Sequence, residues 1–127
     1  MRDDQVRRYA RHILLPDVGG LGQTALLVAA ARLELRESEP EAELICAAYL
    51  IAGGVGHVVV RGASDAQLAT LEAVASDSKL ARTGDGSEVI LQPKPGWWPS
   101  AGGDATALAF WRGGLAATRW MADVANT

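Results

Sequence analysis

The sequence predicts an α/β fold with a short, mainly parallel sheet, and two observations support this prediction. Segments with helical apolar spacing alternate with short strand-like segments, in the order helix, helix, strand, helix, strand, helix, strand, helix. Alternating strands and helices form right-handed crossovers, which place successive strands parallel to one another. In addition, Val58-Val59-Val60 is apolar throughout, as a central strand of a parallel sheet usually is.

Length and composition are those of one globular domain. The chain has 127 residues, 49% of them hydrophobic, and a formal net charge of -3. This acidic balance argues against nucleic acid as a partner, because phosphate binding relies on uncompensated Lys and Arg. No apolar run reaches the roughly 18 residues that a membrane span needs, and the chain opens on charge at Met1-Arg2-Asp3-Asp4. We therefore expect a cytoplasmic protein that does not bind membranes.

Residues 1–31 are predicted to form a helical N-terminal segment. Asp3 or Asp4 can cap a first helix, and a short apolar helix is expected from Gln23 to Ala31 after a turn rich in glycine. The first helix carries arginines on one side, for which a solvated face is the simple interpretation. Its apolar side is formed by Val6, Tyr9, Ile13 and Leu14, and its basic side by Arg7, Arg8 and Arg11.

Residues 32–92 are predicted to form the Rossmann-like core of the fold. A strand is expected at about Arg32 to Arg36, where apolar and polar residues alternate strictly. One face of this strand should therefore lie in water or against a polar partner. A helix from about Glu39 to Ala52 should bury Leu44, Ala48, Ile51 and Ala52, together with Cys46 as a small hydrophobic residue.

The second half of this core predicts one more helix and strand. Ser64 and Gln67 have the spacing of a capping box at the start of a helix. One further helical turn is expected from Asp77 to Arg82, then a loop at Gly84-Asp85-Gly86 and a strand from Glu88 to Leu91. His57 is isolated from other ligand-type side chains and is interpreted as structural.

Residues 93–103 form a loop with three prolines between Pro93 and Pro99, too many for a helix or a central strand. Trp97 and Trp98 either fold back onto the core or anchor a protein interface. A long helix should then run from Asp104 to about Val124 within the last segment, residues 104–127. The predicted core stripe of this helix is Ala107, Leu108, Trp111, Leu115, Thr118 and Ala122.

Two further patterns in the last helix concern its partners. Trp111 and Trp120 are nine residues apart, about half a turn out of phase, so both cannot face one core. One of them, with Trp120 as a candidate, should contact a second subunit or be partly exposed. Ala109, Gly113 and Ala117 form a small-residue face that would let another helix approach closely.

The stretch from Arg8 to Gln23, R-Y-A-R-H-I-L-L-P-D-V-G-G-L-G-Q, resembles the opening motif of the ThiF/MoeB/HesA family. Those proteins are adenylating enzymes related to ubiquitin activators, and their motif is R-Y-x-R-H/Q-I-x-L-P-x-x-G-x-x-G-Q. Tyr49 to Val60 is a second, weaker match. The resemblance implies a small Rossmann-like three-layer fold, trimmed relative to the family. It also implies that Arg11 corresponds to the arginine that reaches the ATP of a neighbouring subunit.

The same resemblance implies that the ATP site is lost. The family's G-x-G-G-x-G loop would fall at Ser38 to Glu43, which reads S-E-P-E-A-E. Glycines are needed there so that backbone N–H groups can approach phosphate, whereas carboxylates repel it. Gly62 stands where the family has its ribose-binding Asp, and Thr70 to Val74 stand where it has N-L-x-R-Q. With Cys46 as the single cysteine, the paired CxxC zinc motif is missing too, so we expect neither ATP nor zinc as a cofactor.

These departures favour a catalytically inactive ThiF/MoeB-like pseudoenzyme without adenylating activity of its own. We expect a protein-binding or dimerising scaffold or regulatory subunit, whose partner is a second copy or another protein such as a full-length homologue. The alternative is an accessory subunit that lends Arg11 in trans to an active partner in ubiquitin-like activation. The candidates for partner contact are Arg8, Arg11, Trp97, Trp98 and Trp120.

Overall fold

The computed structural model describes residues 20–36, 40–74, 78–91, 93, 96 and 105–126 of the chain. Within them, helices and strands alternate as predicted. The elements are α2 (Gly20–Val28), β1 (Ala30–Glu34), α3 (Glu41–Ala52), β2 (His57–Arg61), α4 (Asp65–Val74), β3 (Lys79–Ala81), β4 (Ser87–Glu88) and α5 (Ala105–Ala125).

The four strands form one parallel sheet in the order β3-β2-β1-β4. The chain adds β2 and β3 on one side of β1 and then returns to the other side of β1 to add β4. This reversal of strand order beside the first strand is the hallmark of Rossmann-like sheets. The structure therefore confirms a small Rossmann-like α/β fold.

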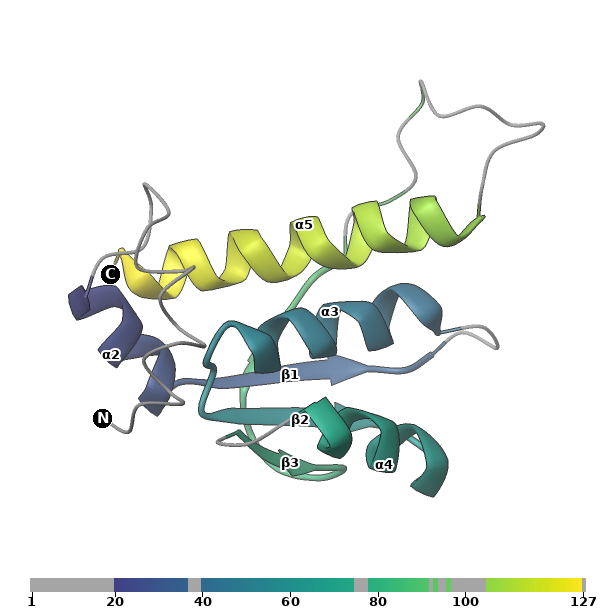
Figure 1. The fold of residues 1–127 in the computed structure, drawn as a ribbon, viewed down its shortest axis with the longest axis horizontal. Coiled ribbons are helices and arrows are strands. Elements are labelled where there is room, and N and C mark those ends of the chain that lie inside the picture. Colours follow the sequence, from purple (N-terminus) through teal and green to yellow (C-terminus); the bar gives the residue numbers. More distant parts are fainter. Residues whose placement is uncertain are drawn as a thin grey trace.

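Helices α3 and α4 cover one face of the sheet, and α5 runs alongside α3 (Figure 1). Since parallel partners share a face, the register from Ala31↔Val58 to Glu34↔Arg61 separates an apolar face from a polar one. The side chains toward the helices are buried, Leu33 and Val60 among them. The other face carries Arg32, Glu34 and Arg61 and confirms the predicted half-polar strand.

No described helix covers this polar face, so the described residues supply two of the three expected layers. The segment from Arg82 to Gly86 lies against it instead. Arg61 Nη2 donates a hydrogen bond to the Gly84 carbonyl at 3.0 Å, and Arg32 Nη1 donates one to the Gly86 carbonyl at 3.2 Å. The two guanidinium groups thus hold this loop on the sheet and shield Val59, which is only 5% exposed.

Packing of α5 against α3 is the largest contact between helices. Gly113 faces α3 so closely that a Cβ atom there would overlap the Ala42 carbonyl and lie 2.9 Å from the Cys46 nitrogen. The prediction that this small-residue face accepts a close helix is confirmed, and the close helix belongs to the same chain. The residues of α5 that become buried are Ala109, Gly113, Ala116, Ala117, Trp120 and Met121.

The predicted core stripe of the last helix is therefore wrong in phase. Ala107 and Thr118 are exposed, because the small residues around Gly113 turn toward α3 and set the rotation of α5. Helix α3 shows a smaller error of the same kind. Ala52 is exposed, and Leu44 and Ala48 are only partly buried because they face α4 and not the sheet.

Backbone pairing also moves several predicted boundaries. The first described helix ends at Val28, and Ala30 and Ala31 join β1 because they pair with β2. The turn predicted from Asp77 to Arg82 is wrong, since Lys79–Ala81 is β3 and the Lys79 amide donates to the Gly56 carbonyl at 2.8 Å. The third expected strand is present but shorter and earlier, at Ser87–Glu88.

Local capping at α4 follows the prediction. The backbone N–H of Gln67 donates to Ser64 Oγ at 3.1 Å, and the backbone N–H of Ser64 donates to the Gln67 side-chain oxygen Oε1 at 2.9 Å. These reciprocal bonds satisfy two amides at the helix start, which is the physical content of a capping box. The extent of the last helix is also close to prediction, from Ala105 to Ala125.

Replacing Gly113 by alanine should destabilise the fold by about 1 to 3 kcal/mol, because the added methyl group meets fixed backbone of α3. The matched control is Gly114→Ala, where the nearest atom is Tyr49 Cε2 at 3.6 Å, an ordinary contact. That control should stabilise the helix by about 0.5 to 1 kcal/mol. Urea unfolding measures both changes. Equal stability of the two variants would contradict the packing described.

Candidate functional site

Open parallel sheets bind ligands outside the carboxyl ends of their strands, where the strand order reverses. In this chain that place lies beyond the ends of β1 and β4, beside the start of α3. A cavity of about 200 Å³ is present there, which we call the switch-point crevice. Its walls are Leu33, Glu34, Arg36, Glu43, Glu88, Val89, Ile90, Leu91 and Arg112.

Charge in the switch-point crevice is mixed and slightly acidic. Three carboxylates and two guanidinium groups line it, which leaves one formal negative charge. No Ser, Thr, Cys, His or Lys is among its described lining residues, so none of these can supply a nucleophile or a neutral base. The crevice has the position of a Rossmann ligand site, and its described lining carries three carboxylates beside two guanidinium groups.

Glu34 is the centre of an ion-pair network at this end of the sheet. Its Oε1 atom lies 3.2 Å from Arg61 Nη1 and 3.3 Å from Arg32 Nε. Arg32 also reaches Glu88 Oε2 at 3.7 Å, and Glu88 Oε1 lies 4.0 Å from Arg36 Nη2. The sequence predicted Arg32, Glu34 and Arg36 as the polar half of an alternating strand, and it gave no signal for Arg61 or Glu88. Their mutual pairing depends on the register of three strands.

The N-terminus of α3 is acidic where a Rossmann fold usually receives phosphate. Glu41 and Glu43 lie in its first turn, and Glu43 is 6% exposed. Pro40 precedes the helix without a side-chain capping bond. Carboxylates stabilise the positive end of a helix dipole, so this end of α3 already carries the charge that a phosphate would bring.

Gly62 follows β2 with a φ of 86°, a left-handed conformation that side chains rarely adopt. A Cβ atom there would lie 3.1 Å from the Leu35 carbonyl. An aspartate in this backbone conformation would be strained. The segment from Thr70 to Val74 lies on α4, where Thr70 Oγ1 donates to the Ala66 carbonyl at 3.0 Å. Thr70, Leu71 and Val74 line a different cavity, away from the switch-point crevice.

Cys46 is fully buried within α3, as predicted. Burial, with a smaller contribution from the nearby Glu43 carboxylate, raises the pKa of the thiol to about 12. The thiol therefore stays protonated at neutral pH and is a poor nucleophile.

The predicted candidates for partner contact are not brought together in the described part of the chain. Arg8, Arg11, Trp97 and Trp98 lie outside the described residues. Trp120 is 8% exposed and its indole N–H donates to Ser87 Oγ at 3.2 Å, so its ring belongs to the core of this chain. Trp111 is the partly buried tryptophan of α5, which agrees with the half-turn difference in phase.

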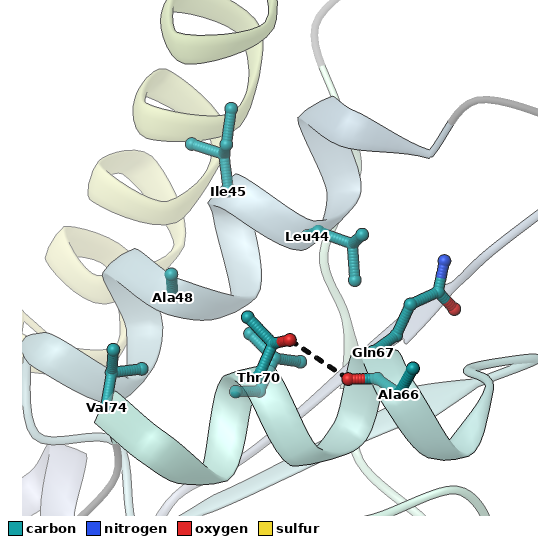
Figure 2. A pocket seen from close by; sticks show the side chains of 8 residues that line it. Leu44, Ile45, Ala48, Ala66, Gln67, Thr70 and Val74 are labelled. Atoms are coloured by element: carbon teal, nitrogen blue, oxygen red, sulfur yellow. Dashed lines mark hydrogen bonds between the residues drawn. The ribbon is translucent and has the colours of Figure 1, made fainter.

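A second cavity, of about 370 Å³, lies between α3 and α4 (Figure 2). Its surface is almost entirely apolar, and Thr70 and Gln67 are the polar residues that line it. We call it the α3–α4 groove. The remaining walls are Leu44, Ile45, Ala48, Ala66, Leu71 and Val74.

The sheet order and the position of the crevice define the chain as a small Rossmann-like α/β domain. A scan against protein-family models finds no match to the chain, and a search of curated proteins finds no match either. None of the described helices is both long and apolar enough to cross a bilayer. The described residues also contain no cluster of three His, Cys, Asp or Glu side chains that could hold a metal ion.

Replacing Glu34 by glutamine should lower the free energy of unfolding by about 1 to 2 kcal/mol, because two half-buried arginines lose their shared carboxylate. The control is Glu88→Gln, whose ion pairs are longer and more exposed. That change should stay within about 0.5 kcal/mol. Urea denaturation in low salt measures both. A Glu34 variant as stable as the Glu88 variant would contradict the central role of Glu34.

Cys46 should resist thiol reagents such as a dithiobis-nitrobenzoate at pH 8, since only about one thiol in 10,000 is ionised at a pKa of about 12. In urea the pKa returns toward its ordinary value and one thiol per chain should react within minutes. Rapid labelling of the folded chain, with an unchanged circular dichroism spectrum, would show that the thiol is accessible.

Proposed function

We propose that this chain is a catalytically inactive relative of the ThiF/MoeB/HesA family that binds protein in place of nucleotide. In this role it acts as a dimerising scaffold or regulatory subunit. The observation that carries the proposal is the acidic first turn of α3, where Glu43 is buried and lines the switch-point crevice and Glu41 is exposed.

The electrostatic cost of a nucleotide at this place supports the proposal. A carboxylate about 4 Å from a phosphate charge costs on the order of 4 kcal/mol at an effective dielectric constant of about 20. Two such groups in the first turn of α3 would oppose much of the roughly 8 kcal/mol of a micromolar complex, while Arg36, one of the two guanidinium groups that line the crevice, already pairs with Glu88. The described start of α3 contains no glycine, and Pro40 before it has no backbone N–H to donate to a phosphate.

The described residues of the matching motifs support it in a second way. A Cβ atom at Gly22 would lie 2.7 Å from Ala125 Cβ, and one at Gly56 would overlap the Leu27 carbonyl. Gln23 is buried, and its side-chain Nε2 donates to the Gly53 carbonyl at 3.1 Å. Each of these residues therefore acts in packing. This packing role needs no bound ligand, as the proposal expects.

Isothermal titration calorimetry with Mg-ATP should give no saturable heat at concentrations up to about 1 mM, the range of millimolar affinity. The variant Glu41→Gln, which removes one exposed carboxylate, should leave this result unchanged because Glu43 and the absence of glycine remain. Saturable binding of ATP by the natural chain would overturn the proposal.

The protein-binding half of the proposal needs its own measurement. Affinity purification from the native organism with mass spectrometry, combined with light scattering of the pure chain, should reveal either a second copy or a defined protein partner. A chain that is monomeric and recovers no partner would contradict a scaffold role, whatever the outcome with ATP.

A further inference from the structure

Strand β4 lies at one edge of the described sheet, and its outer side carries backbone groups that no described residue pairs with. The Val89 N–H donates to the Arg32 carbonyl at 2.9 Å, so the backbone groups of Val89 face β1. Successive residues of a strand direct their backbone groups to opposite sides, so those of Glu88 and Ile90 point away from β1. Among the described residues, neither of these N–H groups donates a hydrogen bond.

The side chains of residues 88–91, which we call the β4 edge, alternate as in an extended strand. Glu88 and Ile90 are exposed, whereas Val89 is buried and Leu91 is partly buried. Ile90 is 73% exposed, and all four residues line the switch-point crevice, so the surface beside them is open. Strand addition uses backbone hydrogen bonds for affinity and alternate side chains for specificity, and the β4 edge offers both.

The order of the sheet points to the same place. A doubly wound sheet in which strands 3-2-1-4 lie side by side continues with a fifth strand beside the fourth. In the described sheet, β4 is the last strand on that side. The next described helix along the chain is α5, which packs against α3 and supplies no strand. The place of a fifth strand is therefore open among the described residues.

We propose that the β4 edge binds an extended segment of another protein, which joins the sheet as its fifth strand. Charge and exposure define the chemistry of that segment. The Glu88 side chain is 44% exposed and its two ion pairs are long, at 3.7 and 4.0 Å, so it can accept a further cation. The segment should therefore place Lys or Arg beside Glu88 and a β-branched apolar residue beside Ile90. The residues between them face the helix layer and should be apolar.

A second copy of this chain fits the β4 edge less well than a basic, apolar strand does. Pairing two copies would bring two Glu88 carboxylates into one short contact, and neighbouring like charges weaken strand pairing. A segment with a cation at that position removes this repulsion. The inference rests on the proposed protein-binding role and adds the form in which the partner binds.

Titration of the isotope-labelled full chain with the peptide acetyl-Ser-Val-Lys-Val-Ile-Val-Ser-amide, followed by NMR, tests the proposal. The backbone amide signals of Glu88 and Ile90 should shift with a dissociation constant on the order of 0.1 to 1 mM. At saturation, exchange of both amide protons with solvent should slow at least about tenfold. A peptide with glutamate in place of lysine should bind at least about threefold more weakly, because it meets Glu88.

The variant Ile90→Pro removes the outward N–H without breaking the bond from Val89 to Arg32, so it should weaken peptide binding at least about tenfold. The matched control is Ile90→Val, which keeps the N–H and a β-branched side chain and should bind within about twofold of the natural chain. Urea unfolding of both variants should show the natural midpoint.

Three results would overturn the proposal. The first is strong protection of the Glu88 and Ile90 amides in the free chain, because another part of the chain then occupies the β4 edge. The second is a peptide that leaves both signals unchanged up to about 2 mM. The third is equal binding of the lysine and glutamate peptides to the natural chain, a comparison that does not depend on how any variant folds. The protein-binding role itself fails by other measurements, namely saturable binding of ATP or a chain that recovers no partner.

Discussion

The close contact between α5 and α3 at Gly113 is the constraint on which most of this structure depends. It joins the end of the chain to the helix that follows β1, and it leaves no room for even one methyl group at that position. The contact sets the rotation of α5, and this rotation brings Trp120 into the core, where its indole N–H donates a hydrogen bond to Ser87 Oγ in β4. The absence of a side chain at Gly113 thus allows α5 to contact both α3 and the edge strand β4.

The two faces of the sheet are stabilised by different physics. On the helix side, Leu33, Val58 and Val60 are withdrawn from water, which is the hydrophobic term that drives folding. On the other side, Arg32 and Arg61 share the Glu34 carboxylate and donate to carbonyl groups of the loop from Arg82 to Gly86. Polar side chains on that face bind a loop and not a helix. The alternation of polar residues in β1 therefore explains why the described residues form two layers, one sheet and one layer of helices.

The charge at the start of α3 bears on what this chain can bind. The switch-point crevice keeps the position of a Rossmann ligand site, but its helix start carries Glu41 and Glu43 in place of a glycine-rich turn. The carboxylates of α4, Asp65 and Glu72, lie away from this crevice and are exposed to water.

The sequence by itself determined the class of fold, the capping box at Ser64, the extent of the last helix and the burial of Cys46, because each depends on local spacing or residue type. It also predicted the acidic start of α3. Only the tertiary structure decided which residues of α5 face the core, because a helix with small residues on several sides can be buried in more than one rotation. The identity of β3 was decided in the same way, since Lys79–Ala81 is a strand only through its pairing with β2. The ion pairs of Glu34 likewise exist only because three strands meet in one register.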